Sequence, residues 1–173
     1  MKRKSLSVTK KTPNFYLTKL KDPQVRKLYS LFSNNLASMD LTNKKIMVGV
    51  SGGADSLAVL FFSQCYALKH HTKLYPVIID HKLRKESTIE AKNLKYKLKQ
   101  NFKINCKILS KKIVKINKNI QSYARDLRYD LFFEECNKQK IDYLLSGHHK
   151  DDLIENFFIR FLRGSGLKGL VSF

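Results

Sequence analysis

The sequence predicts an α/β fold in which a mostly parallel sheet carries helices on both faces, a doubly wound arrangement. Short apolar runs at 44–50, 73–80, 103–110 and 142–147 have the length and composition of buried strands. The segments between them are long enough for helices and repeat apolar residues at helical spacing. An alternation of strands and helices favours parallel pairing through right-handed crossovers, which gives this sheet.

The predicted helices are placed by their apolar spacing and start signals. One begins at Pro23, and a second continues from Ala54 directly after the first strand. Ser87-Thr88-Ile89-Glu90 matches a capping box and predicts a third helix that ends near Asn101. A fourth runs from Ile120 to about Gln139, and a fifth is predicted over 151–162, after the last strand.

The composition bounds the class of protein. A chain of 173 residues with 43% hydrophobic residues can form one domain, so wholesale disorder is excluded. We expect a flexible basic arm over 1–22 and a folded domain over 23–173. The three cysteines are widely spaced and odd in number, which excludes a disulfide scaffold. No apolar run approaches the roughly 18 residues of a membrane span, so we expect no membrane partner and a cytoplasmic location.

The net charge of +20 is unevenly distributed. Residues 1–45 carry 11 basic and 2 acidic groups, and residues 82–118 carry 13 and 2, whereas the rest of the chain is balanced. Such an excess is typical of proteins that bind polyanions. Because Lys outnumbers Arg 27 to 7, a coding bias toward AT-rich codons explains the excess equally well.

The strongest motif follows the first strand. Here the sequence is Ser51-Gly52-Gly53-Ala54-Asp55-Ser56, and an apolar helix comes next. Two glycines allow the backbone to approach an anion, and the start of the helix directs N–H groups toward it. The loop lacks the Lys of a Walker A motif, so a metal held by Asp55 or basic groups elsewhere must neutralise the anion. The alternative is a plain strand-to-helix turn.

This loop resembles the ATP-binding loop of the PP-loop ATP pyrophosphatase family, and the resemblance implies the adenine nucleotide alpha hydrolase-like fold. Residues 147–156, GHHKDDLIEN, and the RGSGLKGL that starts at Arg163 resemble a signature of the tRNA(Ile)-lysidine synthetase family. DHKLRKES from Asp80 and IQSYARDLRYDLF from Ile120 resemble two further motifs of that family.

The resemblance implies a ligase that forms a carbon–nitrogen bond. ATP would adenylate the C2 oxygen of the wobble cytidine in the CAU anticodon of isoleucine tRNA, with release of pyrophosphate. Free lysine would then displace AMP and form lysidine. Family members continue past the last motif, so we expect the chain to be the N-terminal catalytic part, truncated at its C-terminus. Two alternatives stay open: another PP-loop enzyme that adenylates tRNA, such as a thiolase, and an inactive nucleotide-binding or RNA-binding remnant.

The resemblance also implies roles for individual residues. The residues implied in ATP binding are Ser51, Gly52, Gly53, Ala54, Asp55, Ser56, Asp80 and His81, and Asp55 is also the implied Mg²⁺ ligand. The residues implied in catalysis are Asp55, Arg125, Arg128, His149, Asp151, Asp152 and Glu155. On a helix, Asp151 and Glu155 share a face, which suits an ammonium group or Mg²⁺. Arg125 and Arg128 lie three residues apart and suit a phosphate or carboxylate. Ordinary surface ion pairs and a helix cap are the structural alternatives for these groups.

Overall fold

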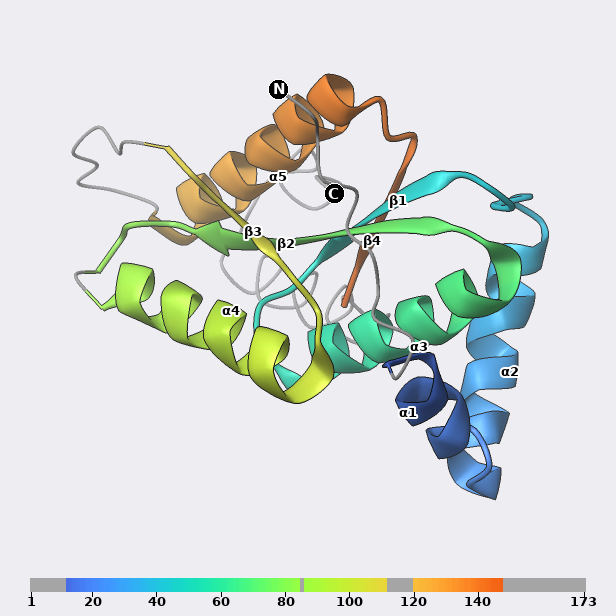
Figure 1. Cartoon of the computed structure of the whole chain (residues 1–173). Helices are drawn as coiled ribbons and strands as arrows, with labels where there is room; N and C mark the ends of the chain where they lie inside the picture. Colours follow the sequence, from blue (N-terminus) through green and yellow to red (C-terminus); the bar gives the residue numbers. More distant parts are fainter. Residues whose placement is uncertain (1–11, 85, 112–119, 148–173) are drawn as a thin grey trace, which may run out of the picture.

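The computed structural model describes residues 12–84, 86–111 and 120–147, and its elements follow the predicted order (Figure 1). Its strands are β1 (Lys45–Gly49), β2 (Lys73–Asp80), β3 (Lys107–Ser110) and β4 (Tyr143–Ser146). They form a parallel sheet in the order β3-β2-β1-β4. The predicted doubly wound α/β class is therefore confirmed.

The helices are distributed over both faces of this sheet. They are α1 (Thr12–Lys19), α2 (Pro23–Ala37), α3 (Ala54–His70), α4 (Ser87–Phe102) and α5 (Ile120–Gln139). Figure 1 shows α5 on one face, α3 and α4 on the other, and α1 and α2 beside α3. Among the described helices, none combines the length and apolar character that crossing a bilayer requires.

The order of the strands creates a switch point between β1 and β4. From β1 the chain moves through α3 to β2 and through α4 to β3, away from β4. After β3, the helix α5 crosses the opposite face and β4 joins the free side of β1. In open α/β sheets, ligands bind beyond the carboxyl ends of the strands at such a point.

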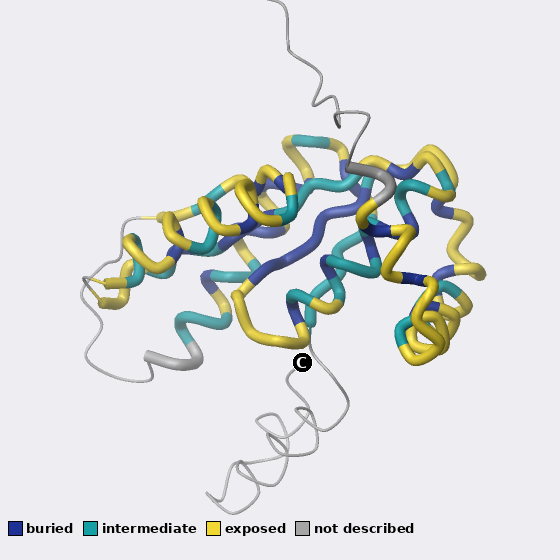
Figure 2. The backbone as a smooth tube through the Cα atoms, turned by 60° about the horizontal axis from the view of Figure 1, so that its bottom comes forward, coloured by how far each residue is buried: buried dark blue, intermediate teal, exposed yellow. Residues whose placement is uncertain are grey.

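The core has two parts because the sheet is covered on both faces. Successive residues of a strand point to opposite faces, so Ile46 and Val48 pack in the cluster formed with α1 to α4, whereas Met47 packs against Phe132 of α5. These three strand residues are buried almost completely, and Figure 2 shows the dark blue of buried residues along the central strands. Burial on both faces explains why the predicted strands are uninterrupted apolar runs.

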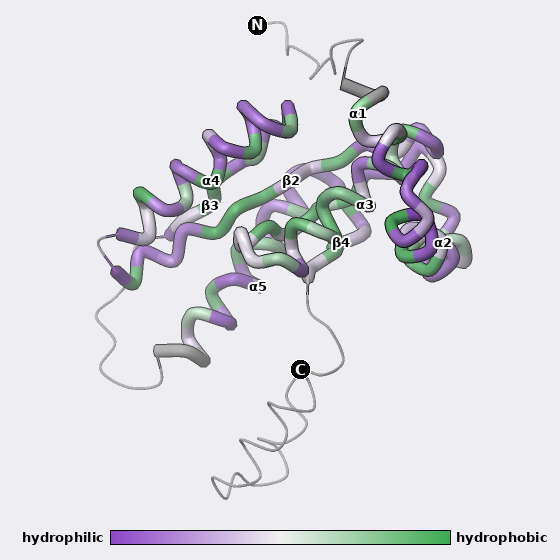
Figure 3. Tube along the Cα trace, turned by 90° about the horizontal axis from the view of Figure 1, so that it is seen from below, coloured by the Kyte–Doolittle hydropathy of each residue, from purple (hydrophilic) through white to green (hydrophobic). Residues whose placement is uncertain are grey.

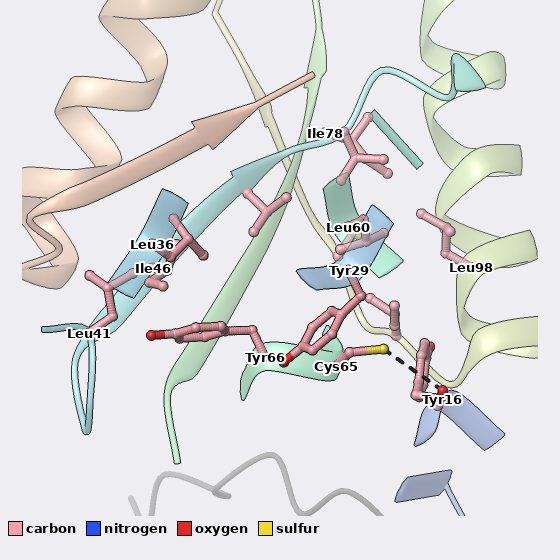
Figure 4. Packing of buried hydrophobic residues seen from close by; sticks show 14 of the residues in the cluster. Tyr16, Tyr29, Leu36, Leu41, Ile46, Leu60, Cys65, Tyr66, Ile78 and Leu98 are labelled. Atoms are coloured by element: carbon pink, nitrogen blue, oxygen red, sulfur yellow. Dashed lines mark hydrogen bonds between the residues drawn. The ribbon is translucent and has the colours of Figure 1, made fainter. Parts of the chain in front are cut away.

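The N-terminal segment is more ordered than we predicted. We expected a flexible arm over 1–22, yet within the described part of it Thr12–Lys19 forms α1, and Tyr16 is 1% exposed. Its hydroxyl donates to the carbonyl of Phe102 at 2.6 Å, and its own carbonyl accepts from the Cys65 thiol (Figure 4). The prediction is wrong for 12–19 because these long-range contacts fix the helix on the core.

Two boundaries also differ from the prediction. Ser87 is the first residue of α4 and its hydroxyl donates to the carbonyl of Arg84, while the Glu90 carboxylate pairs with the Arg84 guanidinium. The predicted capping box therefore does not form. β3 begins at Lys107 instead of Lys103, because Lys103 adopts a left-handed conformation that ends α4.

Candidate nucleotide-binding site

The loop after β1 forms a glycine-lined turn into α3. Gly52 has a φ of +89°, which other residues rarely adopt, and a side chain at this position would meet Leu94 at 3.2 Å. Gly53 caps α3 with extended backbone. The first N–H groups of a helix have no intrahelical acceptor, so the start of α3 directs donors toward the space beyond β1, as an anion requires.

Ser56 holds this loop in shape from inside. Its side chain is buried, and its Oγ accepts hydrogen bonds from the backbone N–H groups of Ser51 and Gly52, each at 3.2 Å. The same Oγ is 3.0 Å from Ser51 Oγ and donates to the carbonyl of Gly53 at 2.9 Å. The hydroxyl of Ser56, which we expected among the ATP-binding residues, organises the loop that would bind an anion.

Gly147, at the end of β4, lies against the start of α3. A Cβ atom at this position would stand 2.5 Å from the backbone nitrogen of Ser56 and 2.7 Å from its Cα. Because rigid backbone fills that space, only glycine fits without displacement. The chain that leaves β4 therefore starts directly beside the loop at the switch point.

A cavity of about 460 Å³ opens on the other side of the loop. Its apolar wall comes from β1, β2 and α4, through Val50, Ile78, Ala91 and Leu94. Its polar residues are Ser51, His81, Arg84, Ser87, Glu90 and Arg128. A lining with both apolar and polar residues suits a heterocycle joined to a charged group, and the volume is within the range of small-molecule sites.

A smaller cavity of about 70 Å³ lies at the switch point itself. It is lined by Ser51 and Ser56 from the loop and by Ser146 and Gly147 from the end of β4. His81 and Arg128 line both cavities, so these two side chains stand at the boundary between them.

His81 and Arg128 contact each other at this boundary. Nη2 of Arg128 lies 3.4 Å from Nε2 of His81. Because a guanidinium only donates, this contact places the imidazole proton on Nδ1, which is buried and has no hydrogen-bond partner among the described residues. Burial, and then the charge of Arg128, lower the pKa of His81, against an opposing effect of Asp80. The neutral imidazole is thus the favoured form.

Asp80, which we expected among the ATP-binding residues, makes hydrogen bonds within the protein. It is 3% exposed and lines neither cavity. Its Oδ1 accepts from the backbone N–H of Lys82 at 3.0 Å, and its Oδ2 accepts from the Thr88 hydroxyl at 2.7 Å. The carboxylate therefore joins the end of β2 to the first turn of α4, and so positions the wall that α4 contributes.

The remaining predicted residues divide into three groups. Asp55 is exposed in the first turn of α3, near the loop. Arg125 lies over the ring of Tyr129, 5.9 Å from its centroid, and lines neither cavity. The predicted helix over 151–162, with His149, Asp151, Asp152 and Glu155, and the glycine-rich turn from Arg163 to Gly166 lie outside the described residues.

Several contributors to the site were not predicted. Leu94 and Glu90 line the larger cavity, and Thr88 fixes Asp80. Gly49 lets Phe132 pack over the end of β1, since a Cβ there would stand 2.7 Å from the ring. Arg128 lies one turn before Phe132 on α5. A glycine at the end of an apolar strand was the available signal for this close approach.

The fold and the site define a nucleotide-binding α/β protein, with a glycine-lined loop at the switch point and a cavity beside it. The sequence pattern of the PP-loop domain matches residues 21–173. The chain therefore belongs to the PP-loop family.

Curated relatives share most of this chain. It is 43% identical over 130 residues to a tRNA(Ile)-lysidine synthase of Orientia tsutsugamushi (strain Boryong). The matched stretch covers 75% of this chain and 29% of that protein. The chain is 38% identical over 143 residues to the tRNA(Ile)-lysidine synthase of Wolbachia pipientis wMel, which covers 82% of this chain and 33% of that protein. The chain thus spans about a third of the length of these relatives.

A solved structure shares the fold. A U34-tRNA thiolase from Methanococcus maripaludis superposes with a TM-score of 0.61 over 82% of this chain and 52% of that chain. The two sequences are 20% identical, so this similarity concerns the fold alone.

Proposed function

We propose that this chain is the ATP-using part of an enzyme that makes lysidine in isoleucine tRNA. The observation that carries the proposal is the Ser51–Ser56 loop, which Ser56 holds open toward the switch point beside a cavity of nucleotide size. The similarity to tRNA(Ile)-lysidine synthases supports the choice of substrate.

ATP fits the described residues. The adenosine would occupy the larger cavity, with its base between the apolar wall of α4 and the end of β2. The phosphates would lie on the loop, where Gly52 leaves room for close approach and the start of α3 supplies N–H donors. Asp55 is the candidate protein ligand for Mg²⁺, and the phosphate oxygens would complete an oxygen-rich coordination shell.

The reaction would need ATP, the wobble cytidine of the tRNA and free lysine beside one another. The C2 oxygen of the wobble cytidine would attack the α-phosphorus of ATP, and pyrophosphate would leave with the electron pair of the broken bond. The lysine amine would then attack C2, lose a proton, and release AMP. Donors on the loop and Arg128 would stabilise charge on the α-phosphate as it develops. His149, Asp151, Asp152 and Glu155 remain our candidates for lysine and metal binding.

The cysteines favour lysine ligation over sulfur transfer. All three are buried. Burial raises the pKa of Cys65 to about 11 and that of Cys106 to about 12, and it also raises the pKa of Cys136. Sulfur chemistry depends on accessible thiolates, and these thiols are instead core side chains. We place the enzyme in the cytoplasm, where it would meet tRNA.

The test is a lysine incorporation assay with this chain. The protein is incubated with Mg²⁺-ATP, labelled lysine and isoleucine tRNA with a CAU anticodon, and both incorporated lysine and pyrophosphate are measured. Asp55→Ala should abolish pyrophosphate release, whereas Asp142→Ala, which removes an exposed carboxylate at the opposite end of the sheet, should not. Near-normal release by Asp55→Ala would remove Asp55 from the site. Pyrophosphate release without lysine transfer would favour another adenylating enzyme.

A further inference from the structure

We infer that the outward face of α4 is an RNA-binding surface that holds the tRNA beside the nucleotide cavity. The surface consists of Lys92, Tyr96, Lys99 and Lys103, here named the α4 stripe. This inference rests on the proposed function, because the tRNA of that reaction is the RNA it would bind.

The first argument is the geometry of the helix. Lys92, Tyr96 and Lys99 follow the spacing i, i+4 and i+7, which places them on one face of α4 over about 10 Å, and Lys103 is the residue that ends the helix. All four are exposed, and Tyr96 is 64% exposed. The opposite face of the same helix carries Ala91 and Leu94, which line the nucleotide cavity. One rigid element thus has the cavity wall on one side and a basic stripe on the other.

The second argument is the local charge. From residue 91 to residue 125 the sequence contains no Asp or Glu. The salt bridges between described residues pair Lys107 with Glu135, Lys111 with Glu134, and Arg84 with Glu90. None of these salt bridges involves a residue of the α4 stripe. Glutamates of α5 thus neutralise the lysines near β3, while those of the α4 stripe have no acidic partner among the described residues.

The third argument is the exposed aromatic ring among the lysines. Lysines neutralise backbone phosphates, and an aromatic face stacks on an unpaired base. A membrane surface fits less well, because a helix that lies in a bilayer interface inserts its apolar face. The apolar face of α4 is occupied, with Ala91 and Leu98 buried in the core. Figure 3 shows α4 at the edge of the molecule, with hydrophilic residues recurring along it.

The test compares two charge reversals of equal size. Lys92→Glu/Lys99→Glu alters the α4 stripe, and Lys73→Glu/Lys138→Glu alters two exposed lysines near the amino ends of the strands. Binding of isoleucine tRNA to the full chain is measured by fluorescence anisotropy over a range of salt concentrations, and ATP binding by calorimetry. Thermal unfolding shows that each variant is folded.

We expect the α4 variant to bind tRNA at least tenfold more weakly, an order-of-magnitude estimate. The slope of log K against log salt should also fall by about two, or about one for each phosphate contact. ATP binding should be unchanged in both variants. Tyr96→Ala should weaken binding by roughly fivefold or more, and Tyr96→Phe should not, since stacking needs only the ring.

Equal losses in the two charge reversals would overturn the inference, because bulk charge would then explain RNA binding. Unchanged tRNA affinity in the α4 variant, or a loss only of binding to phosphatidylserine vesicles, would also overturn it. The proposed function fails separately. If the wild-type chain binds tRNA through the α4 stripe but transfers no lysine, the reaction is wrong and the surface stands. If the α4 variant transfers lysine with an unchanged KM for tRNA, the surface is wrong and the reaction stands.

Discussion

The guanidinium of Arg128 lies 3.4 Å from Nε2 of His81 and so joins α5 to the end of β2 across the candidate site. His81 directly follows β2, and Arg128 lies on α5, the helix that covers the face of the sheet opposite α3 and α4. Phe132 anchors α5 over Gly49, and Arg128, one turn earlier, reaches the boundary between the two cavities. The close approach of Phe132 to Gly49 therefore positions the Arg128 guanidinium at this boundary.

His81 should make stability depend on pH. Its pKa in the folded protein is below the ordinary value of 6.5, so between the two values the unfolded chain binds more protons. The stabilisation is fully present above about pH 6.5 and is lost as the pH falls through the folded pKa. We expect the free energy of unfolding, measured with urea, to fall between pH 7.5 and pH 5.5 on this account.

His81→Gln is the matched control, because the Gln carbonyl can still accept from Arg128 but does not titrate. The difference between wild type and variant should vanish or reverse toward acidic pH. Parallel pH profiles for the two proteins would show that His81 is not the titrating group.

Ser56→Ala should destabilise the protein and weaken ATP binding. The substitution removes the acceptor of two backbone N–H groups in the Ser51–Ser56 loop, and each lost hydrogen bond costs about 0.5–1.5 kcal/mol. Ser63, on the same helix, is equally buried, and its hydroxyl has no partner among the described residues. Ser63→Ala should therefore be neutral or stabilising in urea unfolding. Equal losses would mean that the hydroxyl of Ser56 is not what holds the loop.

Gly147→Ala should be harmful because the added methyl group meets backbone. It would stand 2.5 Å from the nitrogen of Ser56, and accommodation of such overlap costs about 1–3 kcal/mol. Gly53→Ala adds the same group at a position with negative φ, 3.7 Å from the nearest side-chain atom. Thermal unfolding should show a clear loss for Gly147→Ala and little change for Gly53→Ala. A stable Gly147→Ala protein would contradict the close approach of β4 to α3.

Tyr16→Phe should cost about 1 kcal/mol, the ordinary contribution of a hydrogen bond. The lost bond joins the Tyr16 hydroxyl to the carbonyl of Phe102, 86 residues away. Tyr29 is buried in the same cluster, burial raises its pKa to about 12, and its hydroxyl has no partner among the described residues. Tyr29→Phe should leave stability unchanged or raise it. The measurement is chemical unfolding of both variants, and a larger loss for Tyr29→Phe would refute this assignment.

The sheet and its helices could be predicted because burial leaves a local signal. Each strand covered on both faces is a short apolar run, as 45–49 and 73–80 are. The turn at Ser51–Ser56 was predictable for a similar reason: Gly52 needs a positive φ that glycine supplies, and its place between a strand and a helix is visible in the sequence.

What could not be predicted depends on which groups meet in the folded structure. Asp80 was expected to bind ATP, and nothing in the sequence indicated that the Thr88 hydroxyl and the Lys82 N–H would donate to it. Glu90 had the spacing of a capping box, but Arg84 offered it a different partner. The hydrogen bond between the Tyr16 hydroxyl and the Phe102 carbonyl could not be predicted either, since a bond between residues 86 positions apart leaves no periodic pattern in the sequence.

The helix α1 has a consequence for where this domain can be cut. The PP-loop pattern starts at residue 21, so a chain trimmed to that boundary would keep every residue of the Ser51–Ser56 loop and lose α1. It would leave a hole in the cluster where the Tyr16 ring packs beside Phe61 (5.7 Å between ring centroids), open the Cys65 thiol to solvent, and free the carbonyl at the end of α4. We therefore expect a chain that starts at residue 21 to be less stable than one that keeps Thr12–Lys19, since Tyr16 is buried as completely as the central strands.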